Sequence, residues 1–207
     1  MTSLATSGPA ALARIEEFLF DIVGPHFRET GEISPEDFWI ILIWKANRAK
    51  GMARWRIEND TGLSWNTAVK KIAEEIATAE SDEARLKALM SERWKFRLPT
   101  ASAILTVLYP DRFSVYDVRA CETLKADSPE EDHYRLDWPH TDETWPRYLK
   151  FLAAVRSAGP ASSTLREKDH YLWGSSLLRS VKTELATPAK PPKSRKPRTA
   201  KPGKSAS

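Results

Sequence analysis

Residues 98–120 read LPTASAILTVLYPDRFSVYDVRA, and this stretch decides the fold of the chain. Pro99 suits the first turn of a helix, and the apolar residues after it predict a buried helix that ends at Pro110. Apolar and polar residues alternate over 113–115, which predicts a short extended link. Asp117 then opens the next helix. Since a helical core needs no acid there, Asp117 is either a helix cap or a chemically active group.

Apolar residues recur at helical spacing through most of the chain. Gly24 and Pro25 are expected to end the first helix. Ser34 is expected to cap the second helix, and Asp60 or Thr61 the third. No run of alternating β-branched residues is long enough for a sheet. We therefore predict an all-α fold with about eight helices in two packed lobes, over residues 9–23, 35–51, 61–79, 82–94, 99–110, 118–125, 141–158 and 164–185.

A helical domain is expected over residues 1–185, with lobes of roughly 26–110 and of 1–25 plus 111–185. Residues 186–207 are rich in Lys and Pro and predict a disordered basic tail. The tail has seven basic residues and no acid, which leaves 25 basic against 28 acidic residues in the rest of the 207-residue chain. Such a tail is either a soluble tether or a sequence-independent contact to nucleic acid.

Several functional classes lack their signals. The single cysteine, Cys121, excludes a disulfide framework and a cysteine-based zinc site, and the four scattered histidines form no metal motif. No glycine-rich loop for phosphate is present, so we predict neither metal nor cofactor. The first residues do not resemble a signal peptide, and the longest apolar run, Phe38–Trp44, is too short for a membrane span. An intracellular, cytoplasmic protein is therefore expected.

Two groups of cations are candidates for contacts to a polyanion. Lys95 and Arg97 precede the central helix, whose backbone N–H groups near Thr100 would add to an anion site. Lys45 and Arg48 lie three residues apart on one helical face. Each group is either a solvated surface or a set of contacts to DNA phosphates.

Several further side chains have predicted positions in the core, at a pocket or in an ion pair. Trp44 continues an apolar run and either packs in the core or faces a pocket. Tyr116 is expected to line a pocket beside Asp117, and Arg119 to reach a phosphate or pair with an acid. Three residues of the last predicted helix share one face, at i, i+3 and i+7, and predict a structural salt bridge beside a core tryptophan: Arg166, Asp169 and Trp173.

The segment ASAILTVLYPDRFSVYDVRA resembles the helix-hairpin-helix and catalytic-aspartate segment of the base-excision DNA glycosylase superfamily. Two further segments, IWKANRAK and LREKDHYLWGSSLL, resemble the flanking helices of small members. The resemblance covers about residues 38–178. It implies that Asp117 is the catalytic aspartate and that a flipped nucleotide enters a cleft between two helical lobes. It also implies double-stranded DNA as the partner, and hence a place at the nucleoid.

The chain departs from this family at two places. The hairpin of the family usually carries Gly-x-Gly, and here Lys95, Phe96 and Arg97 stand at those positions. Bifunctional members have a Schiff-base lysine where this chain has Pro99, so the resemblance implies a monofunctional enzyme. The four-cysteine iron–sulfur pattern of some members is missing as well.

Three functions are therefore compared. The first is a monofunctional DNA N-glycosylase that releases a damaged or modified base. The second is a helix-hairpin-helix DNA-binding module without catalysis, which the missing Gly-x-Gly favours. The third is a helical protein-interaction domain, which the net negative charge of the body favours. The sequence leaves the base and the oligomeric state open.

Overall fold

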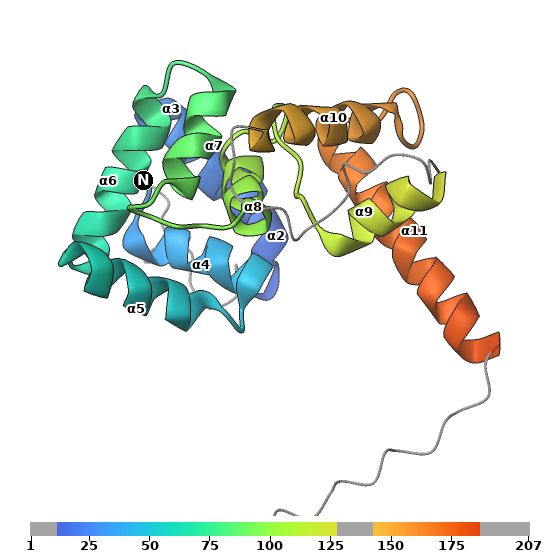
Figure 1. Cartoon of the computed structure of the whole chain (residues 1–207), viewed down its shortest axis with the longest axis horizontal. Helices are drawn as coiled ribbons and strands as arrows, with labels where there is room; N and C mark the ends of the chain where they lie inside the picture. The colour runs from blue at the N-terminus through green and yellow to red at the C-terminus, as the bar shows by residue number, and fades with distance from the viewer. Residues whose placement is uncertain (1–11, 128–142, 187–207) are drawn as a thin grey trace, which may run out of the picture.

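A computed structural model of the chain describes residues 12–127 and 143–186 (Figure 1). Within these ranges the chain is helical with no strand, so the all-α prediction is confirmed for them, and no helix there is long and apolar enough to cross a membrane. The predicted tail lies almost entirely outside the described residues. The elements are α2 (Ile15–Glu17), the π-helix η1 (Phe18–Val23), α3 (Gly24–Thr30), α4 (Pro35–Ala46), α5 (Lys50–Thr61), α6 (Trp65–Thr78), α7 (Asp82–Met90), α8 (Leu98–Leu108), α9 (Val118–Asp127), α10 (Thr144–Ser157) and α11 (Leu165–Ala186).

The central helix of the fold is α8. Nine of its 11 residues are buried, and α3, α4 and α7 pack against it. Figure 1 shows α3 to α7 gathered on one side of α8, and α9, α10 and α11 on the other. Helix α11 packs along α9 and α10. The predicted lobe boundaries near residues 26 and 110 stay a prediction.

The first helical segment runs further than predicted. Gly24 and Pro25 do not end it, because α3 continues to Thr30 and ends at Gly31, which has a φ of 72°. Pro25 lies in the first turn of α3, after the π-helical stretch, where a missing N–H is tolerated. Gly24 is required by packing, since a Cβ there would overlap the carbonyl oxygen of Val107 in α8.

The predicted helix over residues 35–51 ends earlier than expected, and a further helix that was not predicted follows it. Helix α4 ends at Ala46, residues 47–49 form a turn, and α5 begins at Lys50. Only one residue of α5, Ile57, is buried. A helix with so small an apolar face has little periodic signal in its sequence, which is why α5 was not predicted as a separate element.

Serine residues cap three of the helices, which are α4, α6 and α7. Ser34 caps α4 as predicted, and its Oγ accepts the N–H of Asp37 at 3.0 Å. The prediction that Asp60 or Thr61 caps the following helix is wrong, because both residues belong to α5. Ser64 caps α6 instead, accepting a backbone N–H at 3.3 Å.

Candidate functional site

The link between α8 and α9 places Asp117. The backbone of this link is held by side chains of α10 and α8. The Tyr148 hydroxyl of α10 donates to the carbonyl of Ser114 at 2.7 Å and accepts the N–H of Ser114 at 3.1 Å. The N–H of Tyr116 donates to the Ser102 hydroxyl of α8 at 2.9 Å. These bonds satisfy buried polar groups of a non-helical segment, and they fix the direction from which Asp117 enters α9.

The carboxylate of Asp117 is both a helix cap and an ion-pair partner. Its Oδ1 accepts the N–H of Arg119 at 2.8 Å, and its Oδ2 accepts Nζ of Lys45 at 2.9 Å. Burial opposes ionisation, but the charge and hydrogen bond of Lys45 and the N–H groups of Arg119 and Ala120 outweigh it, so the pKa of Asp117 lies below its ordinary value. The cap interpretation is therefore confirmed, and a chemical role of Asp117 stays a prediction.

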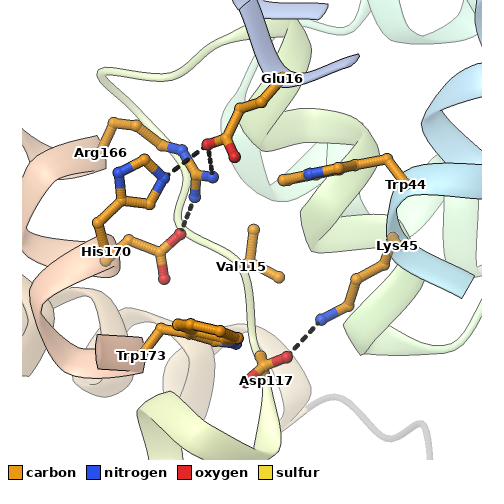
Figure 2. A pocket seen from close by; sticks show the side chains of 9 residues that line it. Glu16, Trp44, Lys45, Val115, Asp117, Arg166, His170 and Trp173 are labelled. Carbon is orange, nitrogen blue, oxygen red and sulfur yellow. Dashed lines mark hydrogen bonds and ion pairs between the residues drawn. The ribbon is translucent and has the colours of Figure 1, made fainter. Parts of the chain in front are cut away.

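Asp117 faces a cavity of about 560 Å³, which we call the Asp117 cavity (Figure 2). This volume lies within the range of small-molecule pockets, roughly 300–1,000 Å³. Figure 2 shows the rings of Trp44 and Trp173 on opposite sides of Val115. The lining combines aromatic, acidic and basic side chains: Glu16, Trp44, Lys45, Val115, Asp117, Arg166, Asp169, His170 and Trp173.

A charge network forms the wall opposite Lys45. Arg166 pairs with both Glu16 of α2 and Asp169 of α11, and Nε2 of His170 lies 2.6 Å from the Glu16 carboxylate (Figure 2). Burial raises the pKa of Asp169, although the charge of Arg166 opposes this. Burial also acts on Glu16, but Arg166 and His170 outweigh it and lower the pKa of that carboxyl. The cavity therefore presents hydrogen-bond donors and acceptors that are already ordered.

Two aromatic residues near Asp117 have different positions. Trp44 lines the cavity and also packs edge-on against Phe20, with ring centroids 5.7 Å apart, so its core and pocket interpretations both apply. Tyr116 is fully buried and packs against Phe151, with ring centroids 4.9 Å apart, and does not line the cavity. Its neighbours on either side, Val115 and Asp117, do line it. In an extended segment alternate side chains point to opposite sides, which directs Tyr116 into the core.

The cations predicted before the central helix lie in a second concavity. Residues 91–97 connect α7 to α8 through a turn, and we call this connection the hairpin. Together with α5 and the end of α4 the hairpin encloses a volume of about 270 Å³, which we call the hairpin groove. It is lined by Leu42, Ala46, Ala49, Lys50, Met52, Ala53, Arg56, Lys95, Phe96, Arg97 and Thr100. The three predicted residues Lys95, Arg97 and Thr100 are therefore neighbours.

The connection between α7 and α8 contains one non-glycine residue with a left-handed backbone. Lys95 has a φ of 51°, a conformation that glycine adopts most readily. The N-terminus of α8 offers fewer N–H groups than expected, because Pro99 has none and the N–H of Thr100 donates to the Arg97 carbonyl at 2.9 Å. An anion at this place would therefore depend mainly on the side-chain cations.

The remaining predicted cations lie outside both concavities. Arg48 is exposed in the turn between α4 and α5 and lines neither the Asp117 cavity nor the hairpin groove. The guanidinium of Arg119 lies over the ring of Trp173, 5.4 Å from its centroid. It therefore supports a wall of the Asp117 cavity.

Sequence reasoning missed most of the cavity wall. Arg166 and Asp169 do form the predicted ion pair, but the prediction of a core tryptophan is wrong, because Trp173 is 46% exposed. All three residues line the Asp117 cavity. Their i, i+3, i+7 spacing was visible in the sequence. Glu16 and His170 gave no such signal, because their contact joins residues 154 positions apart.

The thiol of Cys121 is buried and does not line the Asp117 cavity. Burial raises the pKa of Cys121 to about 12, so its thiol stays protonated, as expected for a small buried apolar residue. Within residues 12–127 and 143–186, no cluster of three or more His, Cys, Asp or Glu side chains could hold a metal ion.

Comparison with protein-family models, curated proteins and solved structures finds no match to this chain.

Proposed function

We propose that this protein binds double-stranded DNA and cleaves the N-glycosidic bond of a damaged or modified base, with Asp117 as the catalytic carboxylate. The observation that carries the proposal is the ionised carboxylate of Asp117 at a cavity with tryptophan rings on two sides. Enzymes that act on a base take it out of the duplex and hold it between aromatic or apolar side chains. Trp44 and Trp173 would serve in this way.

In this mechanism Asp117 stabilises charge. The bond between C1′ and the base nitrogen breaks, the base leaves with the bonding electrons and takes up a proton, and water adds its hydroxyl to C1′. Positive charge develops on the sugar before water arrives, and a fixed carboxylate stabilises it. Lys45 holds Asp117 ionised and oriented before the substrate binds.

The hairpin geometry supports the DNA-binding part of the proposal. The left-handed φ of Lys95 occurs at the position of the first family glycine, so this backbone shape does not require glycine here. The cations of the hairpin groove would contact phosphates, which position a duplex without reading its sequence.

A second candidate, a DNA-binding module without catalysis, is favoured by one observation. Both oxygens of Asp117 already have partners, Lys45 and the N–H of Arg119, as expected of a purely structural cap. The third candidate, a protein-interaction domain, is favoured by the exposed apolar residues along the end of α11, which are Leu177, Leu178, Val181 and Leu185.

The test uses a panel of duplexes that each carry one modified base, with single-turnover kinetics read as abasic sites formed. Asp117→Asn is expected to lower base release by at least about 100-fold while DNA affinity changes by no more than a few-fold. Asp82→Asn is the matched control, because Asp82 also pairs with basic side chains but does not line the cavity.

Unchanged base release by Asp117→Asn would exclude the catalytic role. Salt-sensitive DNA binding without release from any duplex would favour the non-catalytic module. Binding that does not weaken with added salt would exclude both DNA functions.

A further inference from the structure

Two large apolar side chains are exposed on α5. Met52 is 65% exposed and Trp55 is 59% exposed. Residues three and four apart share a face of a helix, so Met52, Trp55 and Arg56 lie together. Met52 and Arg56 also line the hairpin groove. An exposed tryptophan therefore stands at the edge of a concave surface instead of being isolated on a polar helix.

The hairpin groove is basic. Its lining contains four cations, Lys50, Arg56, Lys95 and Arg97, and no acidic residue. Its floor is apolar and includes Leu42, Ala46 and Phe96. This combination fits a ligand that has both negative charges and flat apolar groups.

The four cations differ in how far other groups of the protein use their donors. Lys50 donates through Nζ to the carbonyl of Asn47 at 2.8 Å. Arg56 donates through Nη2 to the carbonyl of Trp94 at 3.2 Å, but its buried Nε has no hydrogen-bond partner within the described residues. Lys95 pairs with Asp60 on the surface, where such a pair contributes little to stability and exchanges easily. Arg97 is exposed, and no ion pair joins it to another residue in the described ranges.

We propose that the hairpin groove and Trp55 form a site for an unpaired nucleic-acid strand. The four cations hold consecutive phosphates, and an unpaired base stacks on the Trp55 ring with Met52 beside it. Base–aromatic stacking on a basic surface is the usual way in which proteins bind single strands without reading their sequence. This inference rests on the proposed DNA-binding function and adds the chemical class of the bound form, which is DNA with a locally unpaired strand.

The groove and the Asp117 cavity share one structural support. Trp44 and Lys45 of α4 line the cavity, whereas Leu42 and Ala46 of the same helix line the groove. A helix with its side chains is about 10–12 Å across. A strand held in the groove therefore lies about one helix diameter from the cavity, and unpairing at Trp55 would favour entry of a neighbouring nucleotide.

An anionic membrane is the other surface that attracts tryptophan and cations together. Membrane-binding helices have a continuous apolar face, whereas the cation Arg56 shares the face of α5 that carries Met52 and Trp55. The groove is also concave, and a bilayer surface is not. The observations therefore favour a nucleic-acid strand.

The test measures binding of the full chain to three fluorescent DNAs, which are a single strand, a perfect duplex and a duplex with a one-nucleotide bulge. Trp55→Ala is expected to weaken binding of the single strand and the bulge about tenfold or more, and of the perfect duplex less than about twofold. Trp55→Phe keeps an aromatic ring and is expected to retain most of the affinity. Leu185→Ala, at an exposed apolar position on α11, is the control and should change nothing.

Equal binding by wild type, Trp55→Ala and Leu185→Ala would overturn the inference. Loss of binding to phosphatidylserine vesicles by Trp55→Ala, with DNA binding unchanged, would overturn it in favour of a membrane site. This assay measures binding without chemistry. Selective loss on Trp55→Ala would therefore support the site even if Asp117→Asn showed that catalysis fails, and normal catalysis with no effect of Trp55→Ala would exclude the site alone.

Discussion

The Asp117 cavity and the hairpin groove use charge in opposite ways. In the cavity each acid lies against a cation: Asp117 pairs with Lys45, and Arg166 joins Glu16 to Asp169. In the groove four cations line the surface with no acid among them. Paired and partly buried charges keep a fixed geometry, whereas surface cations, either unpaired within the described residues as Arg97 is or paired on the surface as Lys95 is, can exchange partners and attract polyanions. Under the proposed function, the cavity would carry the chemistry on one nucleotide and the groove would hold the strand.

The largest effect on stability is expected from removing Lys45, the ion-pair partner of Asp117 in the cavity. Lys45→Met leaves Asp117 as a partly buried carboxylate without its cation; the two side chains are only 16% and 23% exposed. We expect a loss of about 1–3 kcal/mol in the free energy of unfolding. In the groove, Arg97→Met should change it by less than about 0.5 kcal/mol. Urea unfolding measures both, and equal losses would remove the distinction between the two regions.

The next prediction separates binding from chemistry. Arg97→Ala removes one phosphate contact from the groove, so DNA affinity should fall about three- to tenfold and the salt dependence should decrease by about one unit of slope. Base release at saturating DNA should stay unchanged, because Arg97 does not line the Asp117 cavity. Titrations at several salt concentrations and single-turnover rates measure the two quantities. A lower rate at saturation would mean that the groove also shapes the cavity.

The stability of the protein should depend on pH through Asp169, which lines the Asp117 cavity. Burial raises the pKa of Asp169, so its contribution to stability is fully present below the unfolded pKa of about 3.9 and is lost as the pH rises through the raised folded value. The free energy of unfolding of wild type should therefore fall relative to that of Asp169→Asn as the pH rises from about 4 to about 8. Unfolding curves across this range measure it, and a constant difference would contradict the raised pKa.

The smallest expected effect concerns the hairpin backbone. Lys95→Gly and Lys95→Ala both remove the ion pair with Asp60, but only alanine keeps a Cβ at a φ of 51°. The glycine variant should be more stable than the alanine variant by about 0.5–1 kcal/mol. Thermal unfolding compares them directly. Alanine equal to or better than glycine would show that the left-handed conformation is not needed.

Local signals made part of the site predictable. Pro99 marked the first turn of α8, and Asp117 was recognised as the residue that opens α9, because helix starts and caps depend on a few neighbouring residues. Local signals also misled: Gly24 and Pro25 predicted a helix end, but Gly24 serves close packing against α8. The core position of Tyr116 required knowledge of the extended link and of Phe151, which lies 35 residues away.

The sequence by itself determined the helical class of the described residues, the central apolar helix and the acid that follows it. These depend on periodicity and capping, which act over one or two turns of chain. Only the tertiary structure brought Lys45 to Asp117 and Glu16 to Arg166, across 72 and 150 residues. It also placed α5 beside the hairpin. Such pairings depend on how every helix packs against α8, and no short pattern in the chain encodes that arrangement.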